Sequence, residues 1–321
     1  MPPLRSLEIE FPILDARFRR FCASHGIFSV EDFLVHDFSK LVSLAEAEAG
    51  PKELKEGISQ ILSIIDGQHQ PWLNGVQLLE DTLQNKHFLS TGYEGIDMLL
   101  GGGLREGQLT EIVGPSSSGK TQVCLHVASH VADSHLGVVF LDTSNSFSAH
   151  RVACIINQLS GPLAKEVNER RVQRIMTGIT CQSVYDIFVL LDVLHQLEFS
   201  LKVKSESAKT SVLIIDSISS LIAPVLGGKD SQGRLLMISA GFLLKKLADE
   251  YNLAVLVTNH MVSGEGGSLK PALGESWKSV PHVRLLLSRN QGSNIGNMSV
   301  LKHTFVACGD TAEFVIADEA A

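Results

Sequence analysis

Two glycines, a lysine and a threonine stand at a spacing that could hold phosphate groups. The segment 114–121 reads Gly114, Pro115, Ser116, Ser117, Ser118, Gly119, Lys120 and Thr121. Glycine lets the backbone turn so that successive N–H groups point inward at an anion. Lys120 would then reach the terminal phosphates, and the Thr121 hydroxyl would bind Mg²⁺. The pattern predicts a site for a nucleoside triphosphate and magnesium.

The residues on either side of this segment predict the elements that must hold it. Residues 108–113 read as a short strand, and residues 122–132, which begin with Gln122, read as a helix without Pro or Gly. The dipole of such a helix adds partial positive charge at its first turn. A Gly/Ser-rich turn that matches by coincidence is the alternative. The strand–loop–helix setting favours the phosphate loop.

Asp216 is the second candidate for the same site, because it ends an apolar run that is typical of a buried parallel strand. Ligands of open α/β sheets bind beyond the carboxyl ends of the strands, so its carboxylate would hold Mg²⁺ beside Thr121. The alternative is a helix cap, for which Ser217 and Ser219 compete. We predict Lys120, Thr121 and Asp216 as the catalytic residues, and the last two as the metal ligands.

Hydrolysis also needs a group that orients the attacking water and a group that senses the γ-phosphate. Asn259 and His260 follow a predicted strand and are the candidate sensors, although a hydrogen-bonded loop entry explains them equally well. Near the end of another predicted strand, Asp142 is followed by neutral residues, and the next carboxylate is Glu166. A catalytic base is therefore not evident there.

The chain divides into three parts by pattern. Residues 1–66 predict a small helical domain, 67–88 a linker with a short helical piece, and 89–321 an α/β core. Ser29 is a candidate N-cap, and Pro51 opens the last N-terminal helix. The helices expected in the first domain cover 12–25, 29–36 and 51–65. This domain is either a packing appendage or a docking module for a partner.

The linker contains apolar residues that either pack on the chain's own core or anchor into a neighbouring subunit. They are Trp72, Leu73, Val76, Leu78 and Leu79. Packing on the chain's own core is the favoured interpretation, since single apolar residues commonly pack locally.

Strands and helices alternate through the predicted core, which indicates a central parallel sheet with right-handed crossovers. The expected strands are 138–142, 172–176, 212–216 and 253–259, and the expected helices are 183–199 and 233–250. The last segments, 283–288, 298–302 and 313–316, predict an antiparallel extension.

Composition narrows the classes of function. The 321 residues are 44% hydrophobic, and no apolar run is long enough to span a bilayer, so no membrane partner is predicted. The N-terminus has no signal-peptide core, which predicts a protein that is not secreted. The five Cys and 12 His are scattered, against a zinc site or a disulfide framework. The net charge of −8 does not favour broad contact with nucleic acid, which would need local loops or partner chains.

Together these motifs resemble the RecA-type recombinases, in their eukaryotic recombination-paralogue branch, and the resemblance covers nearly the whole chain. Within that branch the chain is similar to the D-type paralogues, those of plants in particular. The segments that carry the resemblance are 89–100, 107–114, 119–122, 141–143, 213–217, 247–251, 257–260 and 270–277.

The resemblance implies a RecA-like P-loop ATPase core with a mostly parallel sheet after a small all-α domain. It implies ATP and Mg²⁺ as cofactors, with Arg151 against the adenine, and a nuclear role in homologous recombination repair. The implied partners are the B-type and C-type paralogues and the X-ray-cross-complementing paralogue. The complex would assist recombinase loading on single-stranded or branched DNA.

The resemblance also implies that the loops 227–234 and 260–282 face DNA. Their candidate phosphate contacts are Lys229, Arg234, Lys270 and Lys278, with Trp277 as a stacking group. Ordinary solvated surface charge explains the same residues at least as well.

Three departures from the active recombinases limit what the resemblance implies. Ser144 stands where they have a glutamate, and His260 where they have a sensing glutamine. The helix-hairpin-helix glycines of the N-terminal domain are reduced to Gly50 and Gly57. We therefore expect ATP binding with at most a weak, DNA-stimulated ATPase activity. The alternatives are an autonomous DNA-dependent strand-exchange ATPase and a protein scaffold that nucleotide only stabilises.

Overall fold

A computed structural model describes most of the chain. The chain divides into two compact units, Met1–Leu78 and Leu79–Ala321. Each unit is described by itself. The described residues are 4–8, 11–48, 50–68, 73–160, 165–203, 210–226, 232–264, 269–290 and 292–316.

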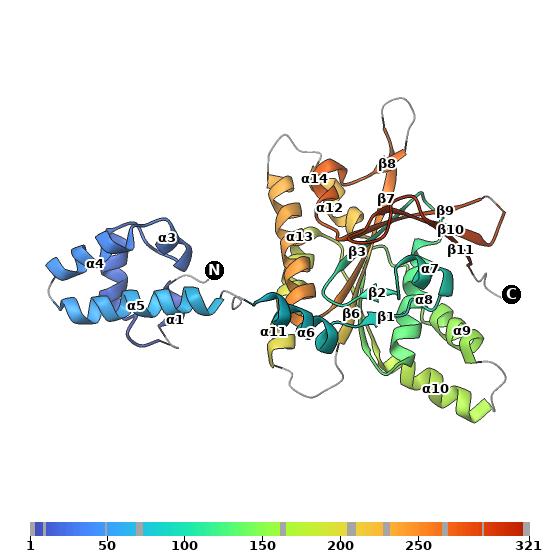
Figure 1. Ribbon diagram of the computed structural model, residues 1–321, viewed down its shortest axis with the longest axis horizontal. Helices are drawn as coiled ribbons and strands as arrows, with labels where there is room; N and C mark the ends of the chain where they lie inside the picture. Colours follow the sequence, from blue (N-terminus) through green and yellow to red (C-terminus); the bar gives the residue numbers. More distant parts are fainter. Residues whose placement is uncertain are drawn as a thin grey trace. The chain divides into compact units, whose positions relative to one another are not determined.

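The first unit is helical (Figure 1). Its helices are α1 (Leu4–Leu7), α2 (Ala16–Ser24), α3 (Val30–Leu34), α4 (Phe38–Ala47) and α5 (Pro51–Gln68). Pro51 opens α5, and Ser29 caps α3 in a capping box with Asp32, as the sequence predicts. Helix α4 was not predicted, although Asp37 accepts hydrogen bonds from its first turn as an N-cap.

Apolar side chains from all these helices form one core. Phe18 and Phe33 stack there with ring centroids 6.3 Å apart. A Cβ at Gly57 would lie 2.4 Å from the Phe18 ring, so α5 can approach α2 closely only with glycine at this position. The unit therefore has its own apolar core and its own caps.

Helix α6 (Gly75–Asn85) continues from this unit into the next, and its apolar residues are exposed. Val76 is 66% exposed, Leu79 59% and Leu83 71%. Leu73 and Leu78 are exposed as well. The prediction that the linker packs on its own core is therefore wrong for its described residues, and Trp72 lies outside them.

The second unit is built on a nine-stranded sheet in the order β11-β10-β9-β3-β7-β6-β4-β5, with β8 paired to β7. Its strands are β3 (Leu109–Gly114), β4 (Gly137–Asp142), β5 (Ile179–Ser183), β6 (Thr210–Asp216), β7 (Ala254–Ser263), β8 (Leu269–Pro271), β9 (Val283–Arg289), β10 (Ile295–Lys302) and β11 (Thr311–Val315). The pairs from β9 to β5 are parallel. Strands β10 and β11 form the predicted antiparallel extension. A separate pair, β1 (Phe88–Leu89) and β2 (Leu104–Arg105), precedes the sheet.

Helices cover both faces of this sheet (Figure 1). One group is α8 (Lys120–Asp133), α9 (Ala149–Ser160) and α10 (Lys165–Thr177), and the other is α11 (Ile187–Val203), α12 (Ile218–Leu226), α13 (Gln232–Tyr251) and α14 (Gly274–Lys278). Helix α7 (Glu94–Leu99) packs near β11. The predicted α/β class with a mostly parallel sheet and N-terminal helices is confirmed.

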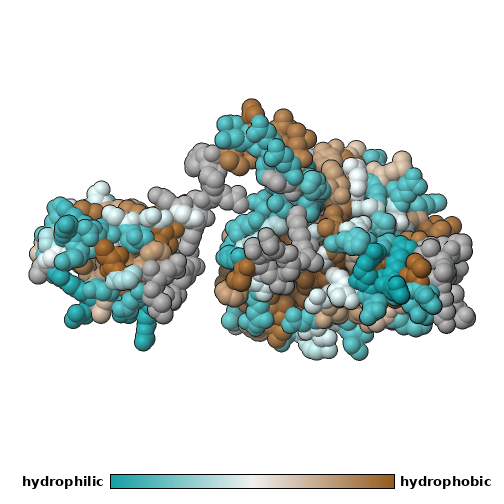
Figure 2. Space-filling view, turned by 90° about the horizontal axis from the view of Figure 1, so that it is seen from below, coloured by the Kyte–Doolittle hydropathy of each residue, from teal (hydrophilic) through white to brown (hydrophobic). Residues whose placement is uncertain are grey.

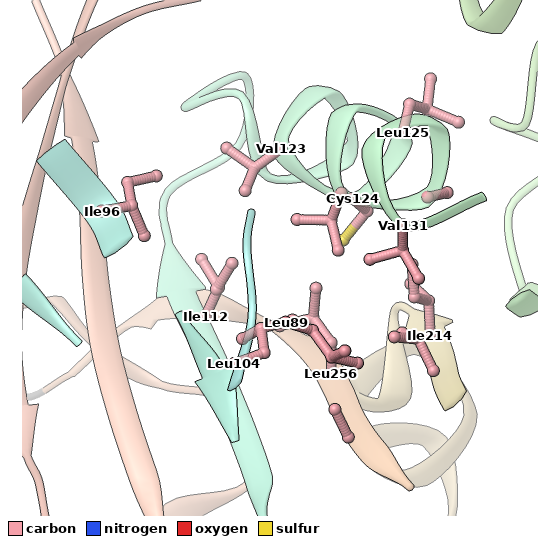
Figure 3. Close-up of a cluster of buried hydrophobic side chains, with 14 of the residues drawn as sticks. Leu89, Ile96, Leu104, Ile112, Val123, Cys124, Leu125, Val131, Ile214 and Leu256 are labelled. Carbon is pink, nitrogen blue, oxygen red and sulfur yellow. The ribbon is translucent and has the colours of Figure 1, made fainter. Parts of the chain in front are cut away.

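Alternation along the central strands sends their side chains into two cores. Figure 3 shows Ile112, Ile214 and Leu256 facing the residues of α8. Their neighbours Leu213 and Val255 enter the core on the opposite face. Two-sided burial of this kind is why these strands read as continuous apolar runs.

One strand was predicted in the wrong place. Residues 172–176 belong to α10, and the strand is β5. Val172, Ile175 and Met176 stand at i, i+3 and i+4, the spacing of one helix face, and Ile175 is fully buried. This helical spacing outweighs the β-branched side chains at 172 and 175.

Figure 2 shows hydrophobic residues interspersed with hydrophilic ones over the face seen from below. Within the part of the chain that the structure describes, the helices are too short or too polar to cross a membrane.

Candidate nucleotide-binding site

The loop between β3 and α8 depends on two glycines for two different reasons. Gly119 has φ 103°, and a Cβ on it would lie 2.5 Å from Ile316 Cδ1. Gly114 has ordinary backbone angles, but its Cβ would lie 2.5 Å from the Leu287 carbonyl oxygen. At Gly119 the positive φ would strain any other residue, and at Gly114 a Cβ would force the backbone of β9 to move.

This loop opens into a cavity of about 470 Å³. The residues that line it are Ser116, Ser117, Gly119, Lys120, Thr121, Gln122, Arg151, His260, Arg289 and Ile316. The structure thus brings together residues from both halves of the predicted site. Pro115 and Ser118 belong to the loop but do not line the cavity. Ser118 is buried, and its Oγ has no hydrogen-bond partner among the described atoms.

Lys120 is held inside the loop. Its Nζ donates to the carbonyls of Gly114 and Pro115, both at 2.8 Å. Burial lowers the pKa of Lys120, and the nearby charge of Asp216 opposes that shift. A buried ammonium surrounded by carbonyl oxygens would gain most from an anion placed in the same cavity.

Asp216 lies directly against the start of α8. The Thr121 hydroxyl donates to Asp216 Oδ2 at 2.5 Å, and the Thr258 hydroxyl donates to Oδ1 at 2.5 Å. Both carboxylate oxygens are therefore engaged by other elements, which places Asp216 at the loop. A hydroxyl and a carboxylate side by side are the oxygen ligands that Mg²⁺ prefers, so the residues fit the predicted metal.

The two predicted sensors, Asn259 and His260, lie in different environments. His260 lines the cavity, and its backbone N–H donates to Ser219 Oγ at 3.0 Å. Asn259 is fully buried, and its amide donates to Glu111 Oε1 at 2.8 Å. Since successive side chains alternate along β7, only one of the two can face the loop. The prediction of Asn259 as a sensor is corrected on this ground.

The segment after β4 carries no base at the cavity. Asp142 is buried and accepts backbone hydrogen bonds from Ser144, Ser146 and Phe147, at 3.1, 3.1 and 2.9 Å. Ser144 is exposed, and its hydroxyl lies 3.2 Å from Ser146 Oγ. Among the described residues that line the cavity, none is a carboxylate. Asp142 thus shapes this turn.

Arg151 reaches the cavity from α9, and its guanidinium donates to Gln122 Oε1. Arg151, which the resemblance places against the adenine, is therefore hydrogen-bonded to the second residue of α8 after Lys120.

The residues predicted to face DNA differ in their exposure. Trp277 is fully buried and donates from Nε1 to Glu111 Oε1 at 2.9 Å, so the prediction that it stacks on a base is wrong. Arg234, Lys270 and Lys278 are exposed on three different elements. Lys278 lies 3.5 Å from Glu275. Lys229 lies outside the described residues.

Sequence reasoning missed two residues of the cavity, Arg289 and Ile316. Arg289 ends β9, and Ile316 directly follows β11. Both reach the loop because β9 pairs with β3, and that pairing is not readable from the sequence. A basic residue at the end of an apolar strand was the one available signal.

The fold and the loop together define a class, the RecA-like α/β proteins with a phosphate-binding loop. A sequence model of the Rad51 family matches residues 84–297, and the chain belongs to the Rad51 family. The resemblance inferred from the motifs is confirmed.

Individual relatives agree with this assignment. The chain is 40% identical over 233 residues to DNA repair protein RAD51 homolog 4 of Bos taurus, across 71% of this chain and 70% of that protein. It is 37% identical over 225 residues to the protein of the same name in Mus musculus, across 69% and 67%. It is 25% identical over 289 residues to meiotic recombination protein DMC1 homolog A of Oryza sativa subsp. indica, across 83% and 76%.

His260 gives the site an expected pH dependence. Burial and the charge of Lys120 lower the pKa of His260, so its ring is neutral above about pH 6.5, its ordinary pKa. A bound triphosphate would favour the protonated ring, so binding should take up protons and tighten as the pH falls from 7.5 to 6. Titration of Mg·ATP at several pH values measures this. The variant His260→Gln keeps hydrogen bonding and loses the titration; an equal pH dependence in that variant would exclude His260 as the cause.

Proposed function

We propose that this protein is an ATP-binding subunit of a heteromeric complex of recombinase paralogues that acts in homologous recombination repair in the nucleus. The observation that carries the proposal is the assembled loop, in which Lys120, Thr121 and Asp216 meet on a Rad51-family core. The names of the animal relatives, which describe DNA repair proteins, support the process.

In this proposal the residues of the predicted site have separate tasks. The backbone N–H groups of 116–121 and the Lys120 ammonium bind the phosphates. Thr121 and Asp216 hold Mg²⁺, which supplies charge neutralisation on the phosphate oxygens. Arg151 and Gln122 contact the base, and His260 contacts the γ-phosphate.

This site is proposed to bind nucleotide but to hydrolyse it slowly. The residue that stands two positions after Asp142 is Ser144, and a neutral hydroxyl cannot take a proton from water at neutral pH without activation. Nucleotide would then hold the subunit in one assembled state and turn over slowly. The complex so formed would assist the loading of the strand-exchange recombinase on single-stranded or branched DNA.

Ser144→Glu is expected to raise turnover. Asp142 pairs with Asp216 across β4 and β6, so position 144 lies just beyond the strand that neighbours the one ending in Asp216. A positioned base contributes about 10²–10⁴-fold to a rate, and a gain of about 10-fold or more is expected for one added without other changes. The matched control is Ser144→Gln, which has the same size and no base. Equal phosphate release from both variants and the unmodified protein would show that a missing base does not limit the rate.

The proposed partners are the B-type and C-type paralogues and the X-ray-cross-complementing paralogue. The exposed aliphatic stripe of α6, formed by Val76, Leu79 and Leu83, supports a protein partner, since such groups are usually covered in a working assembly.

Co-expression of the full chain with these paralogues tests the proposal. Lys120→Arg keeps the positive charge but replaces the compact ammonium by a planar guanidinium. We expect this variant to weaken both complex recovery and repair complementation. Full assembly and full complementation by this variant would instead support the scaffold alternative. Turnover by the purified chain at the rate of an active recombinase would support the autonomous ATPase.

A further inference from the structure

The antiparallel extension of the sheet lies along one side of the phosphate loop. Strand β9 runs parallel to β3 and pairs with it as far as Val113 and Leu286. Beyond that pair the Leu287 carbonyl oxygen comes so close to Gly114 that no Cβ fits between them. Ile316, just after β11, similarly covers Gly119. The extension therefore forms a wall of the nucleotide cavity.

Arg289 is the charged residue that this wall contributes. It is half-buried, and it lines the same cavity as Lys120 and His260. Its Nε donates to the carbonyl oxygen of Ser293 in the turn between β9 and β10. This bond fixes the guanidinium near the end of β9 and reduces the entropy that the side chain would lose on binding a ligand.

The charges around the cavity favour an anion. Lys120, Arg151 and Arg289 supply three cationic groups to the lining, and none of the described residues that line the cavity is acidic. Guanidinium matches phosphate oxygens with two parallel N–H donors, which an ammonium cannot do. Lys120 and Arg289 approach from different elements, α8 and β9, so the two cations meet the ligand from two directions.

We propose that Arg289 is a binding residue for the polyphosphate chain of the nucleotide, which makes β9 and the turn after it part of the nucleotide site. This inference rests on the proposed ATP binding and adds a contact that the phosphate-loop motif does not contain. A phosphate bound by Arg289 then stabilises the end of β9 and, through it, the extension from β9 to β11.

Equilibrium titration of the full-length protein tests the proposal with Mg·ATP, Mg·ADP and AMP. Loss of one charged hydrogen-bonding group should weaken Mg·ATP and Mg·ADP binding about 10- to 100-fold in Arg289→Gln. The affinity of Arg289→Lys should lie between those of Arg289→Gln and the unmodified protein. AMP binding should change by less than about 3-fold, because AMP lacks the β- and γ-phosphates. The matched control is Arg105→Gln, which removes one positive charge from β2, where Arg105 lies over the Phe88 and Phe305 rings.

The outcomes separate this inference from the proposed function. If the unmodified protein binds no nucleotide, ATP binding itself is refuted. If it binds and Arg289→Gln binds equally well, or loses AMP in the same proportion, the assignment of Arg289 to the polyphosphate is wrong. Thermal unfolding without nucleotide shows whether the variant folds.

A second measurement needs no variant. Amide hydrogen exchange of the unmodified protein should slow on Mg·ATP addition in the 287–296 segment as well as in the loop 114–121. Protection confined to the loop would overturn the proposal.

Discussion

Lys120→Ala should reduce Mg·ATP affinity by about 100-fold or more, because it removes the buried cation of the cavity and leaves no other ammonium within the loop. In the folded chain Lys120 already gives hydrogen bonds to two loop carbonyls, so its head group is positioned before the ligand arrives. Isothermal titration of the purified full-length chain gives the affinity directly. Equal affinity in the variant would mean that the loop is not the nucleotide site.

The matched control for this variant is Lys302→Ala. Lys302 also donates to backbone carbonyls, including that of Pro281 at 2.6 Å, and burial lowers its pKa as it does for Lys120. It lies outside the nucleotide cavity. Removing it should affect stability in a similar way while nucleotide affinity stays unchanged. The comparison separates the loss of a ligand contact from general damage to the fold.

Arg284→Leu should lower the free energy of unfolding of the second unit by about 3–5 kcal/mol, since it leaves a buried carboxylate without its charge partner. Glu111 is fully buried on β3, and the Arg284 guanidinium donates to its Oε2 from the neighbouring strand β9. Its other oxygen accepts from Asn259 and Trp277. Urea unfolding, followed by a probe specific for the second unit, measures the change.

Two further variants make this test specific. Arg174→Ala removes an exposed arginine from its pair with Asp133, and it should cost less than about 1 kcal/mol. The double replacement Glu111→Leu and Arg284→Leu should recover part of the loss, because no lone charge then remains in the core. A loss no greater in Arg284→Leu than in Arg174→Ala would show that the buried pair contributes little.

The parts of the site that sequence reasoning predicted are the parts that local spacing determines. The loop 114–121 and Asp216 follow from short patterns within one strand and its next turn, and the structure places Lys120, Thr121 and Asp216 together. The position of His260 follows in the same way from the end of an apolar strand. Its neighbour Asn259 differs only in which face of β7 it occupies, and one residue of register decides that.

The missed and misjudged residues depend on contacts between distant segments. Trp277 stands in a basic stretch and looks exposed, but its partner is Glu111 on a strand far away in the sequence. Arg289 and Ile316 enter the site because β9 lies beside β3, and strand order is a property of the assembled sheet. The apolar residues of α6 were wrongly predicted to pack on the chain's own core, since hydrophobicity alone does not say whether the covering surface belongs to the same chain.

The cluster around Glu111 also limits how this protein can evolve. Its carboxylate accepts hydrogen bonds from side chains on β7, α14 and β9, so replacing any single member leaves buried polar groups without a partner. We therefore expect these four residues to be conserved or replaced together: Glu111, Asn259, Trp277 and Arg284. Lineages that depart from the set are expected to exchange several members together, by way of an apolar intermediate rather than through an unmatched charge.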